Sequence, residues 1–195
     1  MDKKIKWCIE RHKDTNHFYS EYLPYEFHLR MVANVYDDFK HLLDDEVDYF
    51  TGNKYEGVRG DETVTLREAC HGAIWGHDLL EDCRVSFNEA STYLGQEAAE
   101  IIYAVTNEKG KTRKERANSA YYEGIRNTKG AVFVKLCDRI ANVQYSKMTK
   151  SRMFEMYKGE NDHFLEELGC KDGRHLPCIL PYLSMVEYLN KIFIE

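Results

Sequence analysis

The residues of this chain best suited to chemistry lie between His77 and Asp82, where the sequence reads His-Asp-Leu-Leu-Glu-Asp. A histidine and an aspartate are adjacent, two more acids follow within a helical turn, and the preceding run Ala73–Trp75 is apolar. Ionisable groups beside a buried element are costly unless they are paired. Because a divalent metal pairs with imidazole nitrogens and carboxylate oxygens together, we interpret this stretch as half of a metal site. The alternative is an acidic helix end with a chance histidine.

Two further residues complete a candidate metal site. Asp138 interrupts the apolar run that starts at Ala131, and a buried aspartate needs a cation beside it. An arginine could also be that cation, with Arg139 and Arg30 as candidates. His28 lies next to an apolar helical face, where the alternative is a histidine satisfied within the core. The order His, His-Asp, Asp, each from a different predicted helix, favours metal ligands at every position.

These ligands supply two nitrogen and two oxygen atoms, a set that suits Mn²⁺, with Fe²⁺, Co²⁺ or Mg²⁺ as alternatives. The predicted ligands are His28, His77, Asp78 and Asp138. An ion of this kind lowers the pKa of water and polarises a phosphoryl group. No histidine occurs between Asp78 and Asp138, so the sequence predicts one divalent ion rather than two.

Two acids follow the histidine–aspartate pair on the same helical faces. Glu81 comes four residues after His77, and Asp82 comes four residues after Asp78. We predict that both are catalytic: one orients or deprotonates the attacking water, and the other manages the proton of the leaving group. The alternative is a pair of helix-end acids, which the helix dipole mildly disfavours.

The composition limits the class of protein. With 195 residues and 43% hydrophobic content, the chain fits one domain, 1–195. We expect a metal-binding and catalytic core in 1–150 and C-terminal helices in 151–195 that pack on it. A net charge of −6 argues against DNA, RNA or membrane-surface binding, but it is compatible with a small phosphorylated nucleotide as substrate. A homo-oligomer stays open.

The sequence also predicts a cytoplasmic location. The N-terminus lacks the apolar core of a signal peptide, and no apolar run approaches the length of a membrane span. The six cysteines form no C-x-x-C pair, and four lie within apolar helical patterns. Buried, reduced thiols are therefore expected, as in cytoplasmic proteins.

Helical spacing dominates the chain, so we predict an all-α fold, a compact globule of eight or nine helices. The predicted helices cover 3–13, 24–43, 65–81, 86–94, 96–106, 112–126, 131–147, 151–168 and 180–194. Capping boxes at Thr65–Glu68 and Ser86–Glu89 mark two of the helix starts. The glycine-punctuated segment 44–62 is predicted to be a long loop, either a lid over the site or a solvated insertion.

The order His28, His77-Asp78, Asp138 resembles the H…HD…D signature of the HD-domain metal-dependent phosphohydrolase superfamily. Within it, His77–Asp82 is similar to the H-D-x-x-E-D box of alarmone hydrolases, the Rel/SpoT hydrolase domain and its small stand-alone relatives. The other similar segments are Pro24–His28 (P-Y-I-x-H-P), Ala104–Lys109 (V-T-D-D-K), Arg113–Arg116 (E-R-K) and Val134–Asn142 (V-K-L-A-D-(K/R)-L-x-N). The resemblance runs from Ile9 to Asn142 and implies an HD-domain fold.

Some positions depart from the family pattern. Tyr19 and Ser20 stand nine and eight residues before the first histidine, where the family has an Arg-Lys pair that helps to hold the guanine base. Leu29 replaces a proline, and Gln144 replaces an arginine. The metal ligands and acids therefore match the family better than the substrate contacts do.

Three residues are predicted to bind substrate. Asn142 comes four residues after Asp138 and matches the family asparagine, which implies a contact to ribose or phosphate. Arg11 and Lys13 belong to a basic cluster before His28 and are predicted to contact phosphate. A solvated basic helix end is the alternative for these two.

The resemblance implies a metal-dependent phosphohydrolase that acts on a nucleotide, specifically a guanosine 3′,5′-bis(diphosphate) 3′-pyrophosphohydrolase. An HD-type 5′-nucleotidase or nucleoside triphosphate phosphohydrolase is the alternative, because the Arg-Lys pair is missing. An alternative of another class is a non-catalytic nucleotide-binding HD scaffold, which the presence of Glu81 and Asp82 disfavours.

Overall fold

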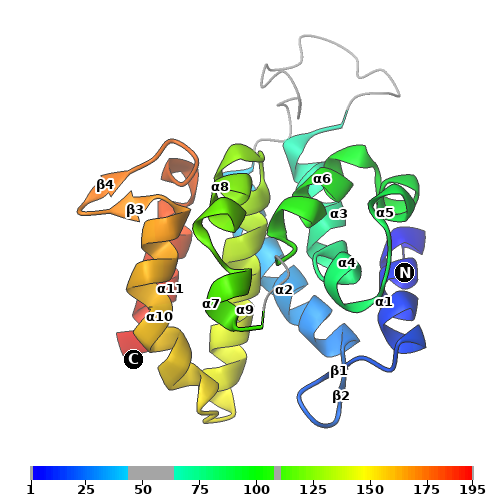
Figure 1. Ribbon diagram of the computed structural model, residues 1–195, viewed down its shortest axis with the longest axis horizontal. Helices are drawn as coiled ribbons and strands as arrows, with labels where there is room; N and C mark the ends of the chain where they lie inside the picture. Colours follow the sequence, from blue (N-terminus) through cyan, green and yellow to red (C-terminus); the bar gives the residue numbers. More distant parts are fainter. Residues whose placement is uncertain (1, 44–63, 108–110, 195) are drawn as a thin grey trace.

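The computed structural model describes residues 2–43, 64–107 and 111–194. In these ranges it has eleven α-helical segments, of which two are four-residue turns and nine are longer helices (Figure 1). The longer helices are α1 (Lys3–Asp14), α2 (Glu26–Phe39), α3 (Leu66–Gly76), α5 (Phe87–Leu94), α6 (Gln96–Val105), α8 (Ser119–Asn127), α9 (Ala131–Met148), α10 (Met153–Leu168) and α11 (Leu183–Ile194). The prediction of an all-α globule of eight or nine helices is confirmed.

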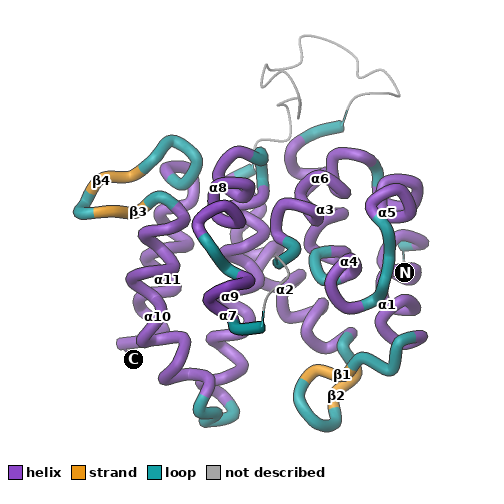
Figure 2. Tube along the Cα trace, in the orientation of Figure 1, coloured by secondary structure: helices purple, strands orange, loops and turns teal. Residues whose placement is uncertain are grey.

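The remaining elements are short (Figure 2). They are the α-helical turns α4 (Leu79–Asp82) and α7 (Arg113–Arg116), the 3₁₀ turns η1 (Lys40–Leu42) and η2 (Leu180–Tyr182), and the strands β1 (Phe18–Tyr19), β2 (Leu23–Pro24), β3 (Cys170–Lys171) and β4 (Arg174–His175). The strands form two antiparallel hairpins, β1 with β2 and β3 with β4. The sequence analysis missed both hairpins, because two-residue strands are too short to show an alternating pattern.

The long helix α9 forms the centre of the fold (Figure 1). It packs against α2, α3, α6 and α8, and also against the C-terminal helices α10 and α11. Phe133, Leu136 and Ile140 of α9 are fully buried, and burying each such side chain contributes about 1.5–3 kcal/mol. The helix α9 thus joins the N-terminal and C-terminal parts of the chain. The division at residue 150 stays a prediction.

The predicted helix over 65–81 is wrong in one respect, because it is broken near its C-terminal end. The helix α3 begins at the expected capping box: Thr65 Oγ1 accepts a hydrogen bond from the backbone N–H of Glu68, and the Glu68 carboxylate accepts one from the backbone N–H of Thr65. It ends at Gly76, and α4 starts at Leu79. Between them, Asp78 has φ −103° and ψ 3°, outside the helical range.

Other predicted boundaries shift less. The helix predicted over 24–43 starts at Glu26 and gives way at Phe39 to the 3₁₀ turn η1. The helix predicted over 112–126 is divided into α7 and α8, because the side chain of Asn118 accepts from the backbone N–H of Tyr121 and caps a new helix. The predicted lid over 44–62 lies outside the described residues.

Two further expectations concern the cysteines and membrane-spanning helices. All six cysteines are free thiols, and Cys8, Cys70, Cys83 and Cys137 are buried, as expected. In the part of the chain that the structure describes, no helix combines the length and apolar character that a bilayer crossing requires.

Candidate active site

The structure brings the four predicted metal ligands together. His28 comes from α2, His77 and Asp78 from the α3–α4 junction, and Asp138 from α9. The Nε2 atoms of the two histidines are 3.2 Å apart. Oδ2 of Asp78 is 2.9 Å from His77 Nε2, and Oδ1 of Asp138 is 3.3 Å from His28 Nε2. Elements far apart in the sequence thus converge on one small volume.

The break between α3 and α4 explains how neighbouring residues share this volume. In a continuous helix, side chains at positions i and i+1 do not face each other. The non-helical backbone at Asp78 lets its carboxylate come within 2.9 Å of the preceding imidazole. The sequence showed the two residue types, but it did not show the helix break that lets His77 and Asp78 face the same volume.

The orientation of His77 is fixed by the main chain. Its Nδ1 lies 3.0 Å from the carbonyl oxygen of Ile74, so Nδ1 carries a proton that it donates to this oxygen. Nε2 then faces the cluster, 2.9 Å from Oδ2 of Asp78. Metal-binding histidines are oriented in this way in many proteins, with the second nitrogen bonded to a carbonyl or carboxylate.

The two carboxylates also have donors that hold them in place. The hydroxyl of Tyr25 donates a hydrogen bond to Oδ2 of Asp78. Asp138 accepts a hydrogen bond from Nδ2 of Asn142 over 2.6 Å, and its other oxygen lies 3.3 Å from Nζ of Lys135. Both carboxylates are therefore oriented before any ion binds.

The partly buried carboxylates of Asp78 and Asp138 are stabilised by positive charge close to them. Burial opposes ionisation of Asp78, but His77 outweighs it and holds the pKa of Asp78 below its usual range. Burial likewise opposes ionisation of Asp138, and Lys135 and the histidines outweigh it and lower its pKa. Burial also opposes protonation of His77, yet the two aspartates raise its pKa to about 9. A cation among these atoms would satisfy the same demand for positive charge.

The donor set therefore fits a divalent metal. Ligand atoms of His28, His77 and Asp78 all lie within 4.8 Å of one another, as residues that share an ion must. Asp138 adds a second carboxylate oxygen, 3.3 Å from His28 and 3.8 Å from His77. Nitrogen and oxygen donors in equal number suit first-row divalent ions, and they do not single out one of them.

The two predicted catalytic acids face different surroundings. Oε2 of Glu81 accepts a hydrogen bond from Nδ2 of Asn107 over 2.8 Å, and its Oε1 lies 3.7 Å from Nη1 of Arg116. Oδ2 of Asp82 lies 3.7 Å from Nδ1 of His17. Burial, with the negative charges of Asp78 and Glu81, raises the pKa of Asp82 to about 7.

A cleft of 600 Å³ opens beside the cluster. Asp138, Asn142 and Glu81 are among its lining residues, so a predicted metal ligand and a predicted catalytic acid line the same cleft. The remaining lining residues come from the α6–α7 connection, α7 to α10 and the residue after α7: Asn107, Arg116, Ala117, Tyr121, Tyr122, Lys135, Arg139, Tyr157, Glu160, His163 and Phe164. The sequence analysis missed the α10 wall, because no recognisable motif extends beyond Asn142.

The predicted substrate contacts do not all reach this cleft. Asn142 lines it, but its side chain is also engaged with Tyr19 and Asp138. Arg11 pairs with Asp14 on α1 at 2.8 Å, and Lys13 is exposed on the same helix. Neither is among the cleft-lining residues in the described chain. Their role as phosphate contacts stays a prediction.

Aromatic rings from the region of the β1–β2 hairpin pack against His28 and Asp78 of the cluster. The ring of Tyr19, from β1, stacks on His28 with centroids 4.7 Å apart. Tyr25, the donor to Asp78, stacks on His12 at 4.3 Å and on His17 at 4.0 Å. We infer that a ligand reaches the cluster from the cleft beside α9 rather than from the β1–β2 hairpin.

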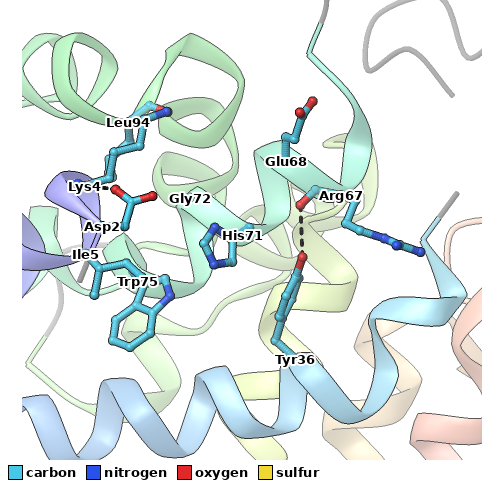
Figure 3. Close-up of a pocket in the computed structure, with 10 residues that line it drawn as sticks. All are labelled: Asp2, Lys4, Ile5, Tyr36, Arg67, Glu68, His71, Gly72, Trp75 and Leu94. Carbon is cyan, nitrogen blue, oxygen red and sulfur yellow. Dashed lines mark hydrogen bonds between the residues drawn. The ribbon is translucent and has the colours of Figure 1, made fainter. Parts of the chain in front are cut away.

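A second, smaller cleft of 290 Å³ lies elsewhere, between α1, α2, α3 and the end of α5 (Figure 3). The side chain of His71 points into it, and the hydroxyl of Tyr36 donates to the carbonyl oxygen of Arg67 beside it. None of the predicted site residues lines this cleft in the described part of the chain. Glu81, Asp138 and Asn142 of the candidate site line the larger cleft instead.

Comparison with known proteins supports the fold. No protein-family model matches the sequence, and no curated protein matches it either. Among solved structures, a metazoan ortholog of SpoT, described as hydrolysing ppGpp with a role in starvation responses, matches with a TM-score of 0.64. The match covers 100% of this chain and 96% of that one, at 16% sequence identity. This chain therefore shares its fold with that protein. At this identity, the likeness establishes the fold and leaves the substrate to be argued from the site.

Proposed function

We propose that this protein is a metal-dependent phosphohydrolase of a nucleotide, and specifically a guanosine 3′,5′-bis(diphosphate) 3′-pyrophosphohydrolase. One observation carries the proposal: two buried imidazoles and two carboxylates converge beside a cleft whose lining includes the further carboxylate of Glu81. The similar fold of a protein that hydrolyses ppGpp supports the choice of substrate.

The metal would be held by the four residues of the cluster, His28, His77, Asp78 and Asp138. Mn²⁺ is the ion that we propose, with Fe²⁺, Co²⁺ or Mg²⁺ as alternatives. When bound, such an ion supplies Lewis acidity and polarises a phosphoryl oxygen. Lys135 stays beside Asp138 and balances part of the negative charge that the ligands place in the interior.

The two acids take different roles in this proposal. Glu81 lines the cleft and is held by Asn107 and Arg116, so it orients the attacking water and accepts its proton. Asp82 has a pKa raised to about 7 by burial and neighbouring charges, so it can hold a proton near neutral pH. We assign Asp82 to the proton of the leaving group.

The cleft offers contacts for the rest of a nucleotide. Arg116 and Lys135 provide positive charge for phosphates, and Tyr121 and Tyr157 add aromatic side chains to the lining. A volume of 600 Å³ lies within the range of small-molecule sites. The overall negative charge is thus offset locally, at the place where a phosphorylated substrate would bind.

One observation favours a second candidate function, an HD-type 5′-nucleotidase or nucleoside triphosphate phosphohydrolase. At the positions of the family's Arg-Lys pair, Tyr19 donates to Asn142, and Ser20 accepts a hydrogen bond from Tyr145 at 3.3 Å. Neither residue carries a positive charge, so the guanine contact implied by the family pattern has no counterpart at these two positions.

The test is turnover of a substrate panel by the Mn²⁺-supplemented protein. The panel contains guanosine tetraphosphate, nucleoside and deoxynucleoside triphosphates, and deoxynucleoside monophosphates. Pyrophosphate release from the tetraphosphate is the expected result. Release of inorganic phosphate from the monophosphates, or of triphosphate from the triphosphates, with the tetraphosphate untouched, would establish the second candidate. Absence of turnover for the whole panel would contradict both.

A further inference from the structure

The carboxylate of Glu81 is held from both sides by residues outside its own helix. Nδ2 of Asn107 donates to its Oε2 over 2.8 Å, and Nη1 of Arg116 lies 3.7 Å from its Oε1. Asn107 follows the end of α6, and Arg116 is the last residue of α7. The segment after α6 and the end of α7 thus each contribute one side chain to the same acid.

This arrangement restricts a side chain that would otherwise be free to turn. A glutamate has three side-chain torsions, and Glu81 lies in a four-residue helical turn. An amide donor on one oxygen and a guanidinium beside the other fix both ends of the carboxylate.

The three residues share a location with the proposed chemistry. Glu81, Asn107 and Arg116 all line the 600 Å³ cleft, together with Asp138 of the metal cluster. Asp82, the neighbouring acid, is not among the lining residues and instead lies beside His17 on the α1 side. The two adjacent acids thus have different partners: Asn107 and Arg116 hold Glu81 at the cleft, and His17 lies beside Asp82.

We propose that Asn107 and Arg116 are positioning residues that hold the Glu81 carboxylate in the orientation needed to accept a proton from water. The inference rests on the proposed function for the role of Glu81, whereas the clamp itself is a property of the protein alone. An aspartate at 107 would lack the N–H donor and add a like charge beside Glu81.

The test that does not depend on activity is a pH titration of Glu81, which ¹³C-carboxyl NMR monitors in the Mg²⁺-loaded protein. The side chains exchanged in Asn107→Asp are nearly isosteric. A second carboxylate at this distance should raise the titration midpoint of Glu81 by about one pH unit or more. Asn88→Asp, at an exposed position of α5, is the matched control and should leave the midpoint unchanged. A Glu81 midpoint that is the same in Asn107→Asp and in the wild type overturns the clamp.

The kinetic test uses whichever panel substrate the wild-type protein turns over. Asn107→Asp should lower kcat at least tenfold, since general-base catalysis typically contributes about 10²–10⁴-fold. KM and metal content should change less than twofold. In a Glu81→Gln background, Asn107→Asp should have no further effect, because a positioning residue acts only through the group that it positions. Multiplicative losses in the double variant would overturn the proposal.

Arg116 is tested by a pair of variants. Arg116→Met removes the cation and should lower kcat, whereas Arg116→Lys keeps the charge and should recover most of the loss. Equal rates for the two variants would remove Arg116 from the clamp. If the wild-type protein turns over no panel substrate, the proposed function fails, and the NMR titration still decides whether the clamp exists.

Discussion

The hydroxyl of Tyr19 donates a hydrogen bond to Oδ1 of Asn142 over 2.9 Å, across 123 positions of sequence. The amide nitrogen of the same Asn142 donates to Oδ1 of Asp138 over 2.6 Å. The hairpin strand β1 is therefore linked through one asparagine to a carboxylate of the metal cluster. Because both ends of its amide are occupied, Asn142 is better suited to orient Asp138 than to bind substrate directly.

This link predicts an effect on metal affinity. Asn142→Ala removes the donor to Asp138, and loss of such an outer contact typically weakens metal binding about 10–100-fold. Tyr19→Phe keeps the ring that stacks on His28 but loses the hydroxyl, so a smaller loss is expected. Calorimetric titration with Mn²⁺ measures both. Tyr22→Phe, at an 82% exposed position, is the control and should bind like the wild type. Wild-type affinity in Asn142→Ala would contradict this role.

The packing beneath the helix break predicts a stability effect at Gly76. A Cβ atom there would lie 2.7 Å from the side chains of both Ile102 and Leu94. Gly76→Ala should therefore destabilise the fold by about 1–3 kcal/mol through overpacking. The matched control is Gly124→Ala in α8, where a Cβ meets nothing within 4 Å. Removal of this helical glycine should stabilise the protein by about 0.4–1 kcal/mol.

Urea unfolding of both glycine variants in the metal-free state separates packing from metal binding. The two substitutions should shift the unfolding midpoint in opposite directions. A Gly76→Ala variant as stable as the wild type would mean that the side chains around it can move aside.

The position of this break illustrates what the sequence could and could not predict. His28, His77, Asp78 and Asp138 stood out because ionisable residues within apolar helical runs are costly without partners. The break at Asp78 could not be read from the sequence, since Leu79, Leu80 and Glu81 all favour helix. Contacts between elements distant in the sequence override this helix propensity, and no local sequence pattern predicts those contacts.

The contacts around Glu81 were missed for a related reason. Asn107 lies 26 positions away in the sequence, and its donation to Glu81 depends on how α6 packs against α3 and α4. Likewise, Tyr157 and His163 on α10 line the cleft without any spacing that marks them as site residues. Periodicity predicts helices and their buried faces, but it does not predict which side chains of different helices meet.

Asp82 predicts a pH dependence of turnover. Burial and the charges of Asp78 and Glu81 raise its pKa to about 7. As the donor of the leaving-group proton, Asp82 must be protonated, so kcat should fall as the pH rises through about 7. Asp82→Asn should have a lower kcat and lack this alkaline limb, whereas Asp38→Asn, on the exposed side of α2, should retain it. A limb that persists in Asp82→Asn would assign the proton to another group.

His12 predicts a loss of stability in acid. It is 1% exposed, and burial lowers its pKa to about 3, from 6.5 in the unfolded chain. Between these values the unfolded state binds a proton that the folded state does not. Stability is therefore fully present above pH 6.5 and falls with decreasing pH, by at most about 1.4 kcal/mol per pH unit.

Urea unfolding of His12→Asn between pH 7 and pH 4 tests this contribution. The slope of stability against pH should be shallower than in the wild type, even if the variant is less stable at pH 7. His41→Asn, at an exposed position of η1, should keep the wild-type slope. Identical slopes for His12→Asn and the wild type would show that His12 does not cause the acid sensitivity.

The central claim is that the cluster of His28, His77, Asp78 and Asp138 holds a single catalytic metal ion. The most direct measurement is a titration of metal-free protein with Mn²⁺, with turnover of guanosine tetraphosphate and bound metal followed in the same samples. We predict that pyrophosphate release rises linearly and saturates at one ion per chain, and that His77→Ala neither binds the ion stoichiometrically nor turns over. Turnover without metal, or stoichiometric binding and wild-type turnover in His77→Ala, would contradict the claim.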